Sequence, residues 1–140
     1  MDYIEKFKEG LERLRKSLAG SNFRGCLNNS TDLTRTSEFV DFDEGVLIGE
    51  FFENLFDNLY DVVQLYEYKK EELEPLKKEI DTVIQFIQTA IPSGNSQTKA
   101  RIYDAMIKAR YISTKFQVQS YRERKHKKGM PPDFEPPFGY

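Results

Sequence analysis

Apolar residues recur every three or four positions through most of the chain, which is the spacing of one face of an α-helix. In the first segment these positions are Ile4, Phe7, Leu11, Leu14 and Leu18. The spacing predicts a helix over about residues 2–18, followed by a stop at Ala19, Gly20 and Ser21.

Three later segments repeat the same spacing and predict helices over about 43–67, 72–91 and 96–125. Their apolar stripes are led by Ile48, Phe52, Leu55, Leu59 and Val62, then by Leu76, Ile80, Val83 and Ile87, then by Ile102, Met106, Ala109, Ile112 and Phe116. No alternating pattern of the kind that marks strands is present. The sequence therefore predicts an all-α domain over 1–128, folded as an antiparallel four-helix bundle.

Two segments depart from this pattern. Residues 21–40 are polar, rich in turn-forming and capping residues, and without a steady apolar period, so they predict a long polar loop after the first helix. Residues 129–140 contain two Pro-Pro pairs and predict an extended tail. Its aromatic residues Phe134, Phe138 and Tyr140 are candidate anchors for a protein partner.

The composition excludes several classes of protein. With 140 residues the chain is the size of one domain, and no apolar run approaches the roughly 18 residues that span a membrane. The start MDYIEKFKEG lacks the apolar core of a signal peptide, so we expect a cytoplasmic protein that binds no membrane. Cys26 and His126 are single residues of their kind, which excludes a Cys/His zinc cluster. His126 lies among Lys125, Lys127 and Lys128, so we expect it to be a solvated residue and not a base that activates Cys26. We expect no cofactor and no small-molecule substrate.

The net charge of -2 hides two segments of opposite sign. Nine acidic residues and no basic one lie between Arg35 and Lys69, whereas ten basic and two acidic residues lie from Lys99 to Lys128. The two segments can pair with each other, within the fold or across an oligomer, and then set the orientation of the contact. Alternatively, the basic helix over 99–128 binds the phosphate backbone of a nucleic acid without reading its sequence. The candidate contacts for that alternative are Lys115, Tyr121, Arg122, Arg124, Lys125, Lys127 and Lys128.

A cluster of carboxylates shares one face of the second predicted apolar helix, at Glu50, Glu53, Asp57 and Asp61. Oxygen ligands of this kind can hold magnesium, although a solvated outer face has the same pattern. Glu50-Phe51-Phe52-Glu53 resembles the first metal-binding motif of all-α nucleoside-triphosphate pyrophosphohydrolases of the MazG type. The resemblance implies a second motif at Lys78-Glu79-Ile80-Asp81, where a lysine replaces a metal-binding glutamate.

Taken together, these features favour a non-enzymatic structural or adaptor subunit that assembles with other proteins. The partner is either a second copy, giving a homo-oligomer, or a member of a larger complex. A nucleic-acid-associated subunit is the alternative, and a MazG-like pyrophosphohydrolase is the distant alternative.

Overall fold

The computed structural model describes residues 2–92 and 95–124, which form five α-helices and one short 3₁₀-helix. In chain order these are α1 (Tyr3–Ala19), α2 (Phe23–Phe39), α3 (Asp43–Leu65), η1 (Lys70–Leu73), α4 (Glu74–Ala90) and α5 (Ser96–Glu123). No β-strand occurs within the described residues, so the all-α prediction is confirmed. None of these helices is both long enough and apolar enough to cross a membrane.

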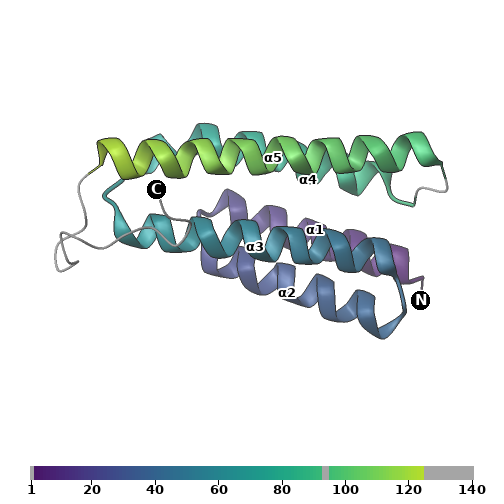
Figure 1. Ribbon diagram of the computed structural model, residues 1–140. Helices are drawn as coiled ribbons and strands as arrows, with labels where there is room; N and C mark the ends of the chain where they lie inside the picture. Colours follow the sequence, from purple (N-terminus) through teal and green to yellow (C-terminus); the bar gives the residue numbers. More distant parts are fainter. Residues whose placement is uncertain (1, 93–94, 125–140) are drawn as a thin grey trace.

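The five helices form a closed ring in which each has two main neighbours. Around the ring the order is α1, α2, α3, α5 and α4, and α4 returns to α1. Figure 1 shows α4 and α5 as one layer, α1 and α3 as the next, and α2 beneath that pair. Helices α1, α3 and α5 run in one direction, and α2 and α4 run in the other, so α3 and α5 are parallel neighbours.

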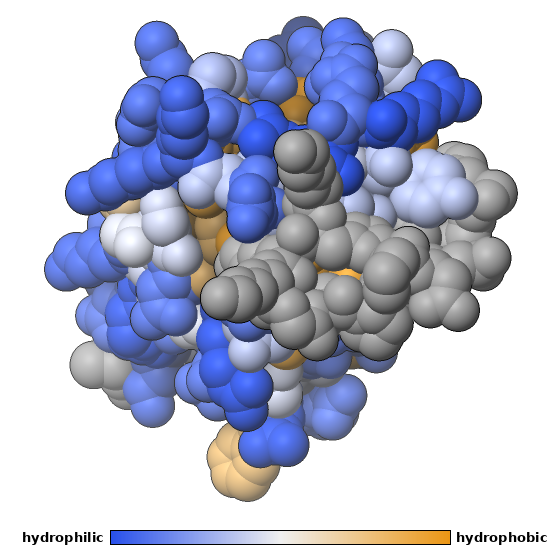
Figure 2. Space-filling view, turned by 90° about the vertical axis from the view of Figure 1, so that its left-hand side faces the viewer, coloured by the Kyte–Doolittle hydropathy of each residue, from blue (hydrophilic) through white to orange (hydrophobic). Residues whose placement is uncertain are grey.

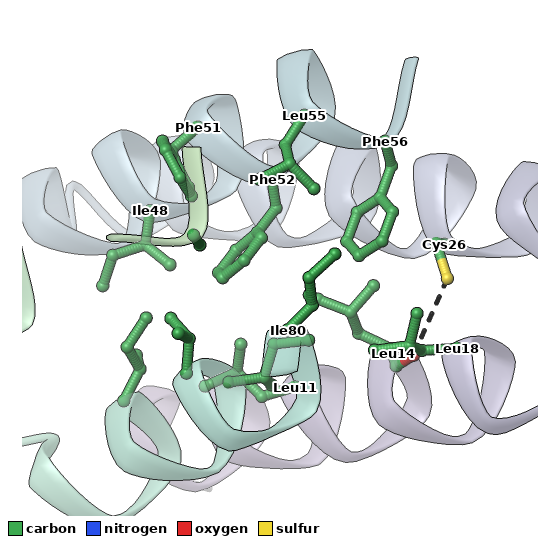
Figure 3. Close-up of a cluster of buried hydrophobic side chains, with 14 of the residues drawn as sticks. Leu11, Leu14, Leu18, Cys26, Ile48, Phe51, Phe52, Leu55, Phe56 and Ile80 are labelled. Carbon is green, nitrogen blue, oxygen red and sulfur yellow. Dashed lines mark hydrogen bonds between the residues drawn. The ribbon is translucent and has the colours of Figure 1, made fainter. Parts of the chain in front are cut away.

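The core lies inside this ring and is built mainly from leucine, isoleucine and phenylalanine. Leu11 and Leu14 of α1 and Ile80 of α4 point toward Phe52 and Phe56 of α3 (Figure 3), and all five side chains are fully buried. Burying one such side chain stabilises the fold by about 1.5–3 kcal/mol. The apolar periodicity of the sequence therefore corresponds to a real inner face on these helices.

The predicted loop over 21–40 is wrong, because most of this segment is helix α2. Four of its six buried residues are small or polar, namely Cys26, Ser30, Thr34 and Ser37, and the other two are Phe23 and Leu33. The Ser30 hydroxyl donates to the Cys26 carbonyl at 2.8 Å and the Thr34 hydroxyl to the Ser30 carbonyl at 3.2 Å. These hydroxyls are satisfied by their own helix, so they can be buried at little cost and yet leave no apolar period. The predicted four-helix bundle is accordingly a five-helix bundle.

Small residues also bring α2 and α3 unusually close together. A Cβ atom on Gly49 would lie 2.7 Å from the backbone nitrogen of Thr34 and 3.0 Å from its Cα. Because these are backbone atoms, no side-chain rotation can make room for a larger residue. The α2–α3 contact is thus a close approach of two helix backbones that requires glycine at this position.

Candidate interaction surface

The exposed cations of α5 are the strongest feature that the sequence predicted. Its basic residues Lys99, Arg101, Lys108, Arg110, Lys115 and Arg122 are all exposed. None of them lies within 4.0 Å of a carboxylate in the part of the chain that the structure describes. Lys115 and Arg122 therefore lie at the surface, as binding residues would have to, and so does Tyr121, which is 38% exposed.

Arg124 differs from these cations, because its side chain is used inside the fold. Its guanidinium forms an ion pair with Glu72, donates to the Glu67 carbonyl at 2.9 Å, and lies 4.3 Å from the centre of the Tyr68 ring. The ion pair and hydrogen bond hold the pKa of Glu72 below its usual range. Arg124 thus fixes the end of α5 to the segment between α3 and α4. The other predicted contacts in this region, Lys125, Lys127, Lys128, Phe134, Phe138 and Tyr140, lie outside the described residues.

An apolar stripe runs along the outward side of α5, between its cations. Tyr103, Ile107 and Tyr111 are spaced four residues apart and are 37%, 65% and 68% exposed. Residues at this spacing lie on one face of a helix. At the end of the bundle where α5 stops, the described surface is mostly hydrophilic (Figure 2). The apolar stripe is therefore not part of a larger apolar surface at that end. Ile107 is not among the contacts predicted from the sequence, although the spacing of the apolar residues could have revealed it.

The outward face of α3 has the opposite charge. The helix contains Asp43, Glu44, Glu50, Glu53, Asp57 and Asp61 and no basic residue. Burial and the neighbouring Asp57 raise the pKa of Asp61, and burial raises that of Glu44 although the charge of Lys99 opposes it. Among the described residues no ion pair joins α3 to α5. Apart from the longer-range attraction between Lys99 and Glu44, pairing of the two segments within the chain, one of the sequence-based alternatives, is therefore not seen in this part of the molecule.

Phe116 of α5 packs against the buried cluster of Val62, Leu65 and Tyr66 at the end of α3, but the middle of the α3–α5 contact is polar and open. The Arg110 guanidinium lies 5.6 Å from the centre of the Phe51 ring, and a pocket of about 220 Å³ separates the helices beside it. Gln117 lines this pocket and is only 4% exposed. Its Nε2 donates to the Ser113 hydroxyl at 3.0 Å, but its buried Oε1 has no hydrogen-bond partner. A buried polar atom left unsatisfied costs about 1–3 kcal/mol, so this contact is weaker than the core.

The two halves of the MazG-like motif do not meet as a metal site. Asp81 of α4 accepts hydrogen bonds from Arg15 of α1, at 2.9 and 3.3 Å, while Glu50 is exposed on α3. Within residues 2–92 and 95–124, no group of three His, Cys, Asp or Glu side chains lies close enough together to hold a metal ion.

A larger groove of about 990 Å³ lies between the end of α1 and the start of α4. Lys77 lines it, almost fully buried, and its Nζ donates to the Ser21 hydroxyl at 2.9 Å and to Glu74 at 2.7 Å. Arg15 and Asp81 pair on the same wall. The Arg15–Asp81 pair therefore connects α1 to α4, and Lys77 connects α4 to Ser21 in the turn that follows α1.

The single cysteine has no reactive environment. Cys26 is fully buried on α2, and its Sγ lies 4.0 Å from the Leu14 carbonyl (Figure 3). Burial raises the pKa of the thiol to about 12. A thiol that stays protonated and out of solvent is not a nucleophile at neutral pH.

Comparison of the chain with protein families, with curated proteins and with solved structures finds no match in any of the three. The charges, exposure and contacts of the described residues are therefore the basis for assigning a function.

Proposed function

We propose that the protein is a non-enzymatic helical assembly module, which binds a protein partner through the outward face of α5. The observation that carries this proposal is the exposed stripe of Tyr103, Ile107 and Tyr111 among cations that have no ion pair in the described structure.

The stripe has the composition of a contact surface between proteins. Tyrosine and arginine are enriched in such surfaces, and an isoleucine at the centre gains about 1.5–3 kcal/mol when it is fully buried. The surrounding cations favour an acidic partner and disfavour a basic one. Assembly would thus use the apolar stripe for affinity and the cations for the choice of partner.

The six exposed cations of α5 also support the alternative of nucleic-acid binding, in which tyrosines stack on bases. Ile107 argues against that alternative, because an isoleucine offers neither an aromatic face nor a hydrogen bond to a nucleotide. It is also among the most exposed apolar side chains of the helix.

Site-specific photo-crosslinking in cells tests the proposal. A photoreactive phenylalanine analogue replaces Ile107 in one variant and Thr36, an exposed residue on α2, in a control variant. We expect protein adducts at position 107 well above those at position 36. Nuclease-sensitive adducts at position 107 would favour the nucleic-acid alternative, and equal adduct formation at both positions would refute the role of α5.

A further inference from the structure

We infer that the partner is a second copy of the same chain, which docks across the joint face of α3 and α5; this inference rests on the proposed function. The first observation is charge complementarity. Helix α3 carries six acidic residues and no basic one, and α5 carries six basic residues and two acidic ones. Neither set forms an ion pair with the other helix in the described structure.

The second observation is the direction of the two helices. Because α3 and α5 lie side by side and parallel (Figure 1), they present one surface with an acidic half and a basic half. A two-fold axis parallel to both helices places α5 of each copy against α3 of the other, so both contacts join opposite charges. An axis perpendicular to the helices in the same plane would place α3 on α3 and is excluded by repulsion.

The third observation is that exposed apolar residues lie at the same height along the two helices. Phe51 lies beside Arg110, and Leu47 precedes Phe51 by one helical turn, as Met106 precedes Arg110. Counting back one turn from this contact places Leu47 near Met106 and its neighbour Ile107, and Leu47 is 51% exposed. Rotation about an axis parallel to the helices preserves height, so Leu47 of each copy meets Ile107 of the other. The dimer has two such apolar contacts, flanked by charges.

The acidic surface of α3 also disfavours the other occupants of this face. A nucleic acid lying along α5 would run beside the carboxylates of Glu50 and Asp57, both of which are exposed. Repulsion from these carboxylates would offset part of the gain from the cations. An unrelated acidic protein would pair with α5 and leave α3 unpaired. A second copy satisfies both halves of the surface at once.

Sedimentation velocity of charge-reversed full-length chains tests this arrangement. One variant carries Glu50→Lys and Asp57→Lys on α3, and the other carries Arg110→Glu and Lys115→Glu on α5. Each alone juxtaposes like charges at both contacts, so we expect the dimer dissociation constant to rise at least about tenfold. An equimolar mixture restores opposite charges at both contacts, and we expect a heterodimer close to wild-type affinity. Arg13→Glu with Arg35→Glu is the control, because it makes the same charge change at exposed sites on α1 and α2.

Cysteine crosslinking tests the register independently of charge. The only native cysteine is buried, so Leu47→Cys and Ile107→Cys each introduce a single accessible thiol. Under mild oxidation we expect the mixture of these two variants to form disulfide-linked dimers faster than a mixture of Thr36→Cys with Ile107→Cys. Circular dichroism of each variant checks that the helices are intact.

The outcomes separate this inference from the function on which it rests. Charge-reversed chains that dimerise like wild type, or equal crosslinking in the two mixtures, would overturn the arrangement. A wild-type chain that stays monomeric at every concentration would overturn the second copy as partner. Protein adducts at position 107 would then still support assembly with another protein, whereas their absence would remove both proposals.

Discussion

Helix α3 packs closely against α2, whereas its contact with α5 combines apolar packing at Phe116 with a polar, more open region. On the α2 side, Gly49 lies against the backbone of Thr34 so closely that a Cβ atom has no room. On the α5 side, a polar pocket separates the helices, and the amide of Gln117 is buried with one atom unsatisfied. The difference indicates that α2 and α3 form a rigid unit, whereas α5 is bound less firmly and exposes its outer face.

We expect the largest effect from Gly49→Ala, which places a methyl group in the close contact between α2 and α3. The added methyl group forces the two backbones apart, so we expect the free energy of unfolding to fall by about 1–3 kcal/mol. This loss occurs although alanine favours a helix over glycine by about 1 kcal/mol. Urea denaturation measures the change, at protein concentrations low enough to keep the chain monomeric.

Gly20→Ala is the matched control for that prediction. A Cβ atom on Gly20 would find its nearest neighbours at 3.7 Å, an ordinary contact, so we expect little change in stability. Equal losses at both positions would show that the backbones are not in close contact at Gly49.

We expect alkaline pH to lower the free energy of unfolding through the ionisation of Cys26 on α2. The pKa of the thiol is raised by burial from 9.0 to about 12. Below pH 9 the thiol is protonated in both states; as the pH rises from 9 toward 12, the unfolded chain loses this proton and the folded chain keeps it. Stability is therefore lost as the pH rises through this range, by at most about 1.4 kcal/mol per pH unit from this group. Urea denaturation at several pH values measures the slope.

The variant Cys26→Ala isolates the contribution of the thiol, because it removes the titrating group and leaves the others. We expect its stability to fall less steeply with pH than that of the wild type. Identical slopes would mean that the thiol ionises as readily in the folded chain as in the unfolded one.

At the more open contact between α3 and α5, we expect Gln117→Leu to stabilise the protein. The substitution removes a buried amide whose Oε1 has no partner and replaces it with an apolar side chain, so we expect a gain of about 1 kcal/mol. Gln119→Leu, at an exposed position of the same helix, is expected to change little. A loss of stability at position 117 would show that the amide makes a favourable interaction between α3 and α5.

The smallest effect is expected from Arg110→Ala, which removes the contact of the guanidinium with the Phe51 ring. Such contacts contribute about 0.5–1 kcal/mol at exposed sites. Lys108→Ala is the control, since Lys108 is exposed, lies two residues before Arg110, and has no ring contact of this kind among the described residues. A change at position 110 no larger than that of the control would show that the Arg110–Phe51 contact does not help to hold α5 against α3.

The same contrast explains what the sequence could and could not predict. Leucine, isoleucine and phenylalanine at helical spacing marked α1, α3, α4 and α5, whose ends lie within about two residues of the expected ones. Helix α2 was missed because Ser30, Thr34 and Ser37 take the buried positions that apolar residues usually occupy. These small residues recur at helical spacing, and two of them face Gly45 and Gly49 of α3. The pattern can be recognised only when α3 is known to be the neighbouring helix.

The candidate surface was predicted in part for a similar reason. Charge is readable from the sequence, so the acidic and basic helices were found. Whether they pair depends on how each helix is rotated in the bundle, and only the structure shows that their charged faces form no ion pair in the described region. The use of Arg124 within the fold depended likewise on Glu72 and Tyr68 lying beside it.

Hydrogen–deuterium exchange measured at low and high protein concentration tests most directly whether α5 is the loosely held, partner-binding helix. We expect the amides of α5 to exchange faster than those of α2 and α3 in dilute protein, because α5 has the weaker contacts. We expect them to become protected at high concentration, while those of α2 stay unchanged. Uniform exchange of all five helices, with no dependence on concentration, would contradict the account.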